Sequence, residues 1–154
     1  MGQETERKFL VKDFSFKEEA YRSDEIKQGY LSIMPEKSVR VRTKYKKAFL
    51  TIKGKTTGFS RAEFEYEIPL DDARKMMELF CETIIDKERY LVKYDNFTWE
   101  VDVFHGENEG LVLAEIELNS ENTTFAIPEW AGREVTGDQK YYNANLIKQP
   151  YRKW

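Results

Sequence analysis

The sequence has little of the chemistry on which many enzymes and metal proteins depend. It contains one cysteine, Cys81, and one histidine, His105, in 154 residues. No disulfide can therefore form within the chain, and zinc sites built from cysteine and histidine are excluded. A Cys–His nucleophile pair is not indicated either, because Cys81 falls on the apolar side of a predicted helix and His105 lies far along the chain beside a glycine-rich turn.

Long hydrophobic runs are also missing. No stretch approaches the ~20 apolar residues that a membrane-spanning helix needs, and the chain begins without the apolar run of a secretory signal. We therefore expect a cytoplasmic protein with neither a membrane nor a nucleic acid as its partner. The net charge of -3 arises from 25 basic and 28 acidic residues that nearly cancel, so a local arrangement of charge must select any ligand.

What the sequence does contain is a strong period of two, which is typical of β-strands. About eight such segments, joined mostly by short turns, predict an antiparallel meander that is either open or closed into a barrel. Two segments break the pattern and predict helices, 70–81 and 138 to about 148. No linker or repeat divides the chain, so we expect residues 1–154 to form a single domain.

The alternation sorts the side chains onto two faces. One face is apolar, with Leu31, Ile52, Phe64 and Tyr66 in the first half of the chain and Trp99, Val101 and Ile116 in the second. The other face is charged, and each strand tends to carry one sign. Its members are Glu4, Glu6 and Lys8; Arg40, Arg42 and Lys44; Lys53 and Lys55; Glu63, Glu65 and Glu67; Lys87, Arg89 and Lys93; Glu100 and Asp102; Glu115 and Glu117.

A sheet with one solvated face would also alternate in this way. Two features favour a built site instead: like charges recur at i,i+2, and few serine, threonine or glutamine residues dilute them. Carboxylates ~4 Å apart repel by about 4 kcal/mol at an effective dielectric near 20, so such crowding needs compensation. A divalent cation that prefers carboxylate oxygens, Mg²⁺ or Mn²⁺, together with a polyphosphate bound by arginine and lysine, would supply it.

The same residues resemble a known family. The segment ETERKFLV is similar to the ExExK signature of the CYTH superfamily, the triphosphate tunnel metalloenzymes. The resemblance continues through QGYL, SVRVR, TIKG, SRAEFEYEI, KERY, EVDVF, AEIEL and EVTGDQKYYN, and it covers essentially the whole chain. The pattern looks most like that of the short bacterial inorganic tripolyphosphatases. It implies a closed tunnel of eight antiparallel strands with helices packed outside.

The resemblance also implies roles for individual residues. It makes Lys8 and Tyr30 the pair that positions or activates the attacking water. The carboxylates implied in metal binding are Glu4, Glu6, Glu115 and Glu117, with Glu63, Glu65 and Asp102 on the same acidic side, where a second metal could bind. The residues implied in binding the triphosphate are Lys8, Arg40, Arg42, Lys53, Lys87 and Arg89, with Lys140 closing one mouth of the tunnel.

Three functions fit these residues. The first is metal-dependent hydrolysis of inorganic tripolyphosphate to pyrophosphate and phosphate, by a monomer or a homodimer. The second keeps the fold and changes the chemistry, to a class IV type adenylyl cyclase or a thiamine or nucleotide triphosphatase. The third is a polyphosphate-binding module without activity, which the retained carboxylates disfavour because they would repel the anion.

Overall fold

The computed structural model describes residues 5–34, 36–55 and 62–154. The chain groups into two compact units, the first formed by Met1–Asp24 and Lys87–Trp154 and the second by Glu25–Asp86. Each unit is built around antiparallel strands, so the predicted fold class, mainly β with a few helices, is confirmed. None of the helices in the described ranges has the length and apolar character needed to cross a membrane.

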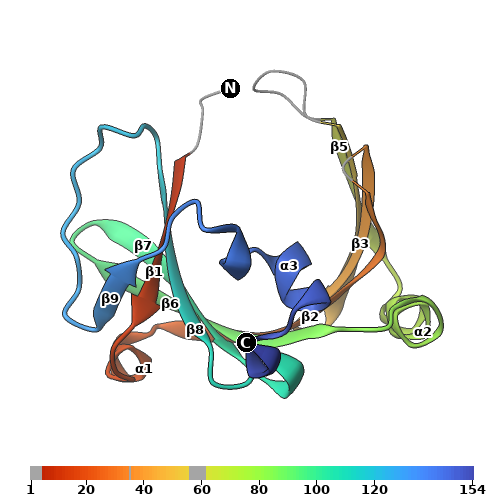
Figure 1. Cartoon of the computed structure of the whole chain (residues 1–154), viewed down its shortest axis with the longest axis horizontal. Coiled ribbons are helices and arrows are strands. Elements are labelled where there is room, and N and C mark those ends of the chain that lie inside the picture. The colour runs from red at the N-terminus through yellow and green to blue at the C-terminus, as the bar shows by residue number, and fades with distance from the viewer. Residues whose placement is uncertain (1–4, 35, 56–61) are drawn as a thin grey trace. The chain divides into compact units, whose positions relative to one another are not determined.

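In the first unit the strands follow one another in the order β6-β7-β8-β1-β9 (Figure 1). Their pairing is antiparallel throughout, as expected for a meander with short connections. The strands are β1 (Thr5–Val11), β6 (Ile85–Tyr94), β7 (Phe97–Phe104), β8 (Val112–Leu118) and β9 (Ala131–Glu134). The helices are α1 (Phe16–Glu19), α3 (Asn143–Lys148) and three 3₁₀ turns, η1 (Gly106–Asn108), η2 (Gln139–Tyr141) and η3 (Tyr151–Lys153).

An aromatic cluster forms the core of this unit. Trp99 of β7 is fully buried, and its ring lies 5.6 Å from that of Trp130 and 5.5 Å from that of Phe9. Phe16 of α1 covers Trp130 at 5.8 Å, and Val101 and Ile116 complete the buried face. The apolar face predicted for this half of the chain is therefore confirmed, and its burial turns the charged residues of the same strands to the opposite face.

The strand β9 was not expected, since the sequence predicted about eight strands and the described residues form nine. It pairs with β1 through only four residues, too few to show a period of two. An ion pair between distant residues supports it: the Arg7 guanidinium donates to both oxygens of Glu134 at 2.8 and 2.6 Å, and it also lies over the ring of Phe125. An ion pair between residues so far apart cannot be recognised in the sequence of a four-residue strand.

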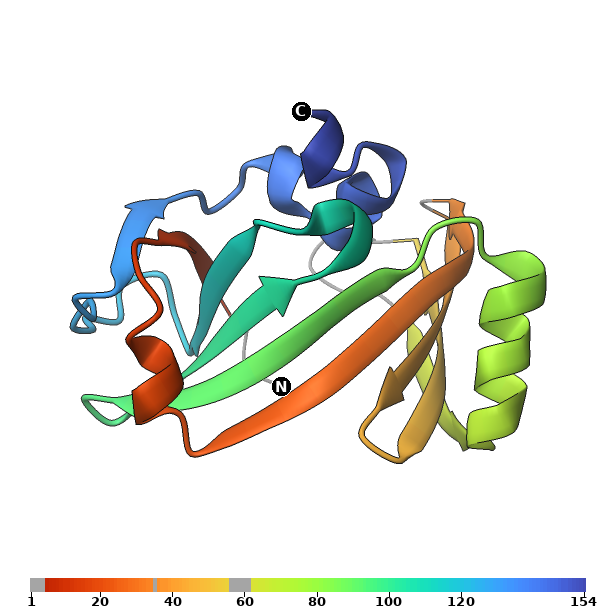
Figure 2. The ribbon, with the colours of Figure 1, turned by 90° about the horizontal axis from the view of Figure 1, so that it is seen from below.

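In the second unit the order is β5-β4-β3-β2, again antiparallel. Its elements are β2 (Arg22–Met34), β3 (Lys37–Lys44), β4 (Lys47–Gly54), β5 (Glu63–Ile68) and the helix α2 (Leu70–Phe80). The helix lies beside the strands of this unit, as Figure 2 shows. Its Ala73 and Met77 pack on Val41 and Ala48, so the helix predicted over 70–81 is confirmed and covers the apolar face of β3 and β4.

Two features of this unit concern the apolar face directly. The eleven-residue helix α2 is too short to cover every strand, so Phe64 and Tyr66 of β5, which the sequence placed on the apolar face, stay more than half exposed. Nearer the helix the packing is tight. A Cβ on Gly29 of β2 would lie 2.7 Å from Sγ of Cys81, so only glycine allows this close approach. Cys81 is thus a half-buried packing residue whose Sγ contacts the Tyr30 carbonyl oxygen at 3.6 Å.

The C-terminal region differs in detail from the prediction. The sequence indicated one helix from 138 to about 148, whereas the chain forms the 3₁₀ turn η2 and then α3. The Asp138 carboxylate accepts a hydrogen bond from the Lys140 amide at 3.1 Å, which favours a tight turn at this point. The short helix α1 was also not predicted, because four residues show no helical period.

Candidate functional site

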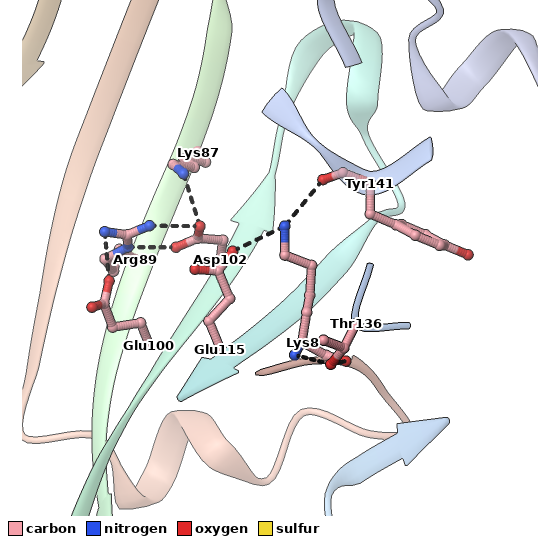
Figure 3. A network of polar contacts seen from close by, with 8 residues as sticks. All are labelled: Lys8, Lys87, Arg89, Glu100, Asp102, Glu115, Thr136 and Tyr141. Atoms are coloured by element: carbon pink, nitrogen blue, oxygen red, sulfur yellow. Dashed lines mark hydrogen bonds and ion pairs between the residues drawn. The ribbon is translucent and has the colours of Figure 1, made fainter. Parts of the chain in front are cut away.

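The strands of the first unit bring eight charged side chains to one face, which we call the first-unit cluster. The registers explain the grouping: Glu6 pairs with Glu117, Lys8 with Glu115, and Arg89 with Asp102 across neighbouring strands. Directly opposed residues of an antiparallel pair point to the same side. The members of the cluster are Glu6, Lys8, Lys87, Arg89, Glu100, Asp102, Glu115 and Glu117, and Figure 3 shows the part around Asp102 and Lys8.

A buried ion-pair network lies at the centre of this cluster. Asp102 is 2% exposed, and its oxygens accept hydrogen bonds from Lys87 Nζ at 2.8 Å and from Arg89 Nε at 2.8 Å (Figure 3). Burial alone would raise the pKa of Asp102, but the two cations outweigh it and hold that pKa well below its usual range. Burial also lowers the pKa of Arg89, and its hydrogen bonds to Asp102 reverse this, so the net shift is upward.

This network departs from the expected role of Asp102. The sequence grouped Asp102 with the metal ligands, whereas both of its oxygens are occupied by Lys87 and Arg89. The physical reason is burial, because two buried cations require a partner that remains ionised. Its metal-binding role stays a prediction. Glu100, which the sequence analysis placed on the charged face without a role, holds the outer side of Arg89 at 2.5 Å.

Lys8 of β1 is also buried and has its own partners. Its Nζ lies 3.4 Å from Glu115 Oε1 and donates to the Tyr141 carbonyl oxygen at 3.4 Å (Figure 3). The ring of Tyr142 lies 5.3 Å from the same ammonium. Contacts between Lys8 and the segment around η2 therefore bring the C-terminal region to the first-unit cluster, a neighbourhood that the period of β1 could not reveal.

Glu6, Glu115 and Glu117 form the acidic side of the cluster. Partial burial and the nearby charges of Glu115, Glu117 and Glu100 raise the pKa of Glu6 from 4.5 to about 7, while Lys8 acts in the opposite direction. Glu6 is exposed as a whole residue, so the crowding of carboxylates contributes a large part of this shift. An ion with positive charge would relieve that repulsion.

The donor chemistry of this acidic side fits a hard divalent cation, which prefers carboxylate oxygens. In the ranges that the structure describes, however, no group of three or more histidine, cysteine, aspartate or glutamate side chains is already arranged to hold a metal ion. Glu4, the first carboxylate of the ExExK segment, lies outside the described residues. The carboxylates present have the right chemistry and the right surplus of negative charge for such an ion.

The second unit carries a second group of polar side chains, the second-unit cluster. Tyr30 pairs with Arg40, Arg40 with Thr51, and Thr51 with Glu65, so one row crosses four neighbouring strands. Gln28 pairs with Arg42 in the next row along β2 and β3. The members of this cluster are Gln28, Tyr30, Arg40, Arg42, Thr51, Lys53, Glu63 and Glu65.

Two arginines of this cluster are positioned by neutral groups. Arg42 Nε donates to Gln28 Oε1 at 2.9 Å, and a terminal nitrogen of Arg40 reaches Thr51 Oγ1 at 3.5 Å. Thr51 is buried and donates in turn to Glu65 at 2.9 Å. Lys53 faces Glu63 at 3.9 Å in a largely solvated pair. Hydrogen bonding to uncharged side chains orients a guanidinium without neutralising its charge, which suits binding of an anion.

The remaining predicted residues have these locations. Tyr30 is half-buried in β2 of the second unit and Lys8 belongs to the first, so their pairing stays a prediction. Lys140 is exposed in η2, and its Nζ lies 4.2 Å from the centre of the Trp154 ring. Trp154 is 42% exposed, and its ring also contacts Tyr141 and Tyr151.

Gln28 and Thr51 are the residues that the sequence analysis missed. Both share the strand parity of predicted site residues, Gln28 with Tyr30 and Thr51 with Lys53. That parity was the available signal, but uncharged side chains were not counted on a face recognised by its charge.

Comparison with known proteins identifies the family. The model of the CYTH domain matches residues 2–151. A curated inorganic triphosphatase of Acetivibrio thermocellus is 52% identical over 153 residues, covering 99% of this chain and 97% of its own. A second inorganic triphosphatase, from Nitrosomonas europaea, is 35% identical over 93% of this chain and 95% of its own.

A solved structure agrees with these relatives. The crystal structure of an inorganic triphosphatase superposes with a TM-score of 0.77 and 31% identity, covering 96% of this chain and 95% of that one. The resemblance found in the ETERKFLV segment and its companions is therefore confirmed, and the chain belongs to the CYTH domain family.

Proposed function

We propose that this protein hydrolyses inorganic tripolyphosphate to pyrophosphate and phosphate in a reaction that depends on a divalent cation. The observation that carries the proposal is the grouping of Glu6, Glu115 and Glu117 on neighbouring strands, where partial burial together with the nearby carboxylates raises the pKa of Glu6 to about 7. Such repulsion is unfavourable in the empty protein and is relieved by a cation. The curated relatives named inorganic triphosphatases, 52% and 35% identical, support the same reaction.

The metal would be held by Glu6, Glu115 and Glu117, together with Glu4. Members of the triphosphate tunnel metalloenzyme family use divalent metals, and the all-oxygen donor set favours Mg²⁺ or Mn²⁺ over zinc or copper. When bound, the ion would withdraw charge from phosphate oxygens and lower the pKa of a coordinated water. Glu63 and Glu65 of the second-unit cluster are proposed for a second ion.

The basic residues would bind and orient the substrate. Arg40, Arg42 and Lys53 would neutralise phosphate oxygens from the second unit, and Lys8, Lys87 and Arg89 from the first. Arginine contributes two-pronged contacts, whereas lysine contributes a compact charge. Phosphoryl transfer needs mainly positioning and charge stabilisation, so the chain needs no covalent nucleophile. Lys8 and Tyr30 would orient the attacking water, and Lys140 would close one mouth of the family's tunnel.

Enzymes of the second class, an adenylyl cyclase or a thiamine or nucleotide triphosphatase, must also bind an organic group. That group needs an apolar or stacking pocket next to the phosphate site. The described members of the two clusters are almost all charged or hydrogen-bonding side chains, which favours a bare polyanion. We also propose that residues 1–154 act as one domain, in the cytoplasm, as a monomer or a homodimer.

One assay tests the proposal. Phosphate release is measured from tripolyphosphate, ATP, thiamine triphosphate and pyrophosphate, with Mg²⁺ or Mn²⁺ and with excess chelator, while cyclic nucleotide is measured in parallel. We expect the highest kcat/KM for tripolyphosphate and no turnover in chelator. A clear preference for ATP, or formation of cyclic AMP, would assign the second class. Full activity in chelator would contradict the metal-dependent mechanism.

A further inference from the structure

Gln28 is the most deeply buried polar side chain of the second-unit cluster. It is 0% exposed in β2 and lies directly opposite Arg42 of β3. The Arg42 Nε donates to its Oε1 at 2.9 Å. A fully buried amide next to a predicted phosphate-binding arginine needs a physical explanation, because buried polar groups are normally hydrogen-bonded at both ends.

The contact with Arg42 determines which way the amide points. A guanidinium has only donors, so the oxygen of Gln28 must face it and the nitrogen must face away. In that orientation Nε2 of Gln28 has no hydrogen-bond partner among the described residues, and the same is true of Nε of Arg40 on the adjacent strand. Two buried N–H groups from neighbouring strands therefore lack acceptors, and an anionic oxygen would satisfy them.

The packing on the opposite face of β2 fixes the register of this strand and so keeps Gln28 next to Arg42. Gly29 follows Gln28 and turns to the opposite face, where Sγ of Cys81 and the side chain of Ile84 fill the space that a Cβ would need. A one-residue slip of β2 would bring side chains into those atoms. The strand thus keeps Gln28 on the same face as Tyr30, Arg40 and Arg42, which it shares by register.

We propose that Gln28 is a substrate-binding residue with two functions. Its oxygen orients the Arg42 guanidinium, and its Nε2 donates a hydrogen bond to an oxygen of the phosphoryl group that Arg42 binds. The proposal rests on the proposed function insofar as the anion is tripolyphosphate. A neutral donor suits this position because it adds a hydrogen bond while its other end accepts one from the arginine, which a lysine or arginine could not do.

Two substitutions separate these functions. Gln28→Glu keeps an oxygen acceptor for Arg42 and nearly the same volume, but it replaces the donor with a second carboxylate oxygen. Gln28→Met keeps the length and removes both hydrogen bonds without adding charge. Lys27→Met, one residue earlier and exposed on the other face of β2, is the matched control. The measurements are KM and kcat for tripolyphosphate, and the rise in melting temperature that tripolyphosphate produces in chelator.

We expect Gln28→Glu to melt in chelator at or above the wild-type temperature, because a carboxylate strengthens the contact with Arg42. Its KM should rise by 10-fold or more, with a smaller change in kcat, and tripolyphosphate should no longer raise its melting temperature. Gln28→Met should raise KM by about 10-fold, as expected for loss of one hydrogen bond to a charged group. Lys27→Met should behave as wild type.

Wild-type KM in Gln28→Glu would overturn the proposal. So would a wild-type KM in Gln28→Met, since the effect of the glutamate would then be charge repulsion alone. If Gln28→Met is too unstable to assay, Gln28→Leu takes its place, because leucine also removes the donor without adding charge. If the wild-type protein binds tripolyphosphate in chelator without hydrolysing it when metal is added, the proposed function fails, whereas loss of that binding in Gln28→Glu still supports the role of Gln28.

Discussion

Lys87 Nζ lies 2.8 Å from Oδ2 of Asp102, and both residues are 2% exposed or less. Arg89 shares the same carboxylate through two further hydrogen bonds. A carboxylate buried between two cations is ionised because the cations stabilise its charge, and the cations depend on it in the same way. The charge of Asp102 therefore contributes more to the stability of the folded protein than the charges of the solvated carboxylates of the first-unit cluster, such as Glu117.

Replacing Asp102 with asparagine should destabilise the metal-free protein by about 3–5 kcal/mol, because the buried Lys87 would lose the carboxylate that lies 2.8 Å from its Nζ and Arg89 would keep only its ion pair with Glu100. Urea unfolding in chelator measures the loss. Glu100→Gln is the control: Glu100 also contacts Arg89 but is partly solvated, so we expect a smaller loss. An Asp102→Asn variant as stable as wild type would show that the network contributes nothing to folding.

The opposite result is expected at Glu117. Glu117→Gln should abolish most of the activity and leave the metal-free protein as stable as before or more stable, by about 1 kcal/mol, since it removes one of the negative charges that crowd Glu6. Melting in chelator and initial rates at saturating Mg²⁺ measure both effects. Glu67→Gln, in a solvated pair with Lys47, should change neither. Normal rates in Glu117→Gln would argue against its metal-binding role.

The pKa of Glu6 predicts how stability depends on pH. Its folded-state value of about 7 lies above the ordinary 4.5, so between these values the folded protein holds a proton that the unfolded chain has released. The contribution of Glu6 to stability is therefore full below pH 4.5 and is lost as the pH rises through 7. Because Glu6 is exposed, water reduces the size of the effect.

Urea unfolding in chelator at several pH values from 5 to 8 measures this contribution. The wild-type protein should lose more stability across the range than Glu6→Gln, which has no titrating group at this position. Parallel curves for the two proteins would show that Glu6 titrates normally. Because a bound divalent cation competes with the proton, we also expect metal to raise the melting temperature more at pH 8 than at pH 6.

Arg42→Ala should reduce kcat/KM far more than Lys44→Ala, by 100-fold or more against less than about 5-fold. Arg42 is half-buried and oriented by Gln28, so its guanidinium is held in one direction, and water cannot supply the same contacts to phosphate when the side chain is removed. Lys44 is the last residue of β3, next to the Tyr45 turn, where a charge is easily solvated. Initial rates over a range of tripolyphosphate concentrations give both values. Equal, small effects would contradict the assignment of Arg42 to phosphate binding.

Sequence alone was sufficient to predict the strands β1 to β8, the helix α2 and the separation of charged from apolar side chains. These features depend on local geometry: successive residues of a strand point to opposite faces, so the alternation of Arg40, Val41 and Arg42 already shows which side faces the apolar core. The order of motifs from ETERKFLV onward was sufficient to identify the family. None of these inferences required knowledge of which strand lies beside which.

Tertiary structure decided what each charged residue contacts. Asp102 looked equivalent to Glu100 and Glu117 because all three lie on the charged face of their strands, and only the register of β6 against β7 brings Lys87 and Arg89 to it. Gln28 was identified as a site residue only from its burial and from its contact with Arg42, fourteen positions away. The energy of a charge or an amide depends on its partners and on the water excluded around it, and both are set by residues distant in the sequence.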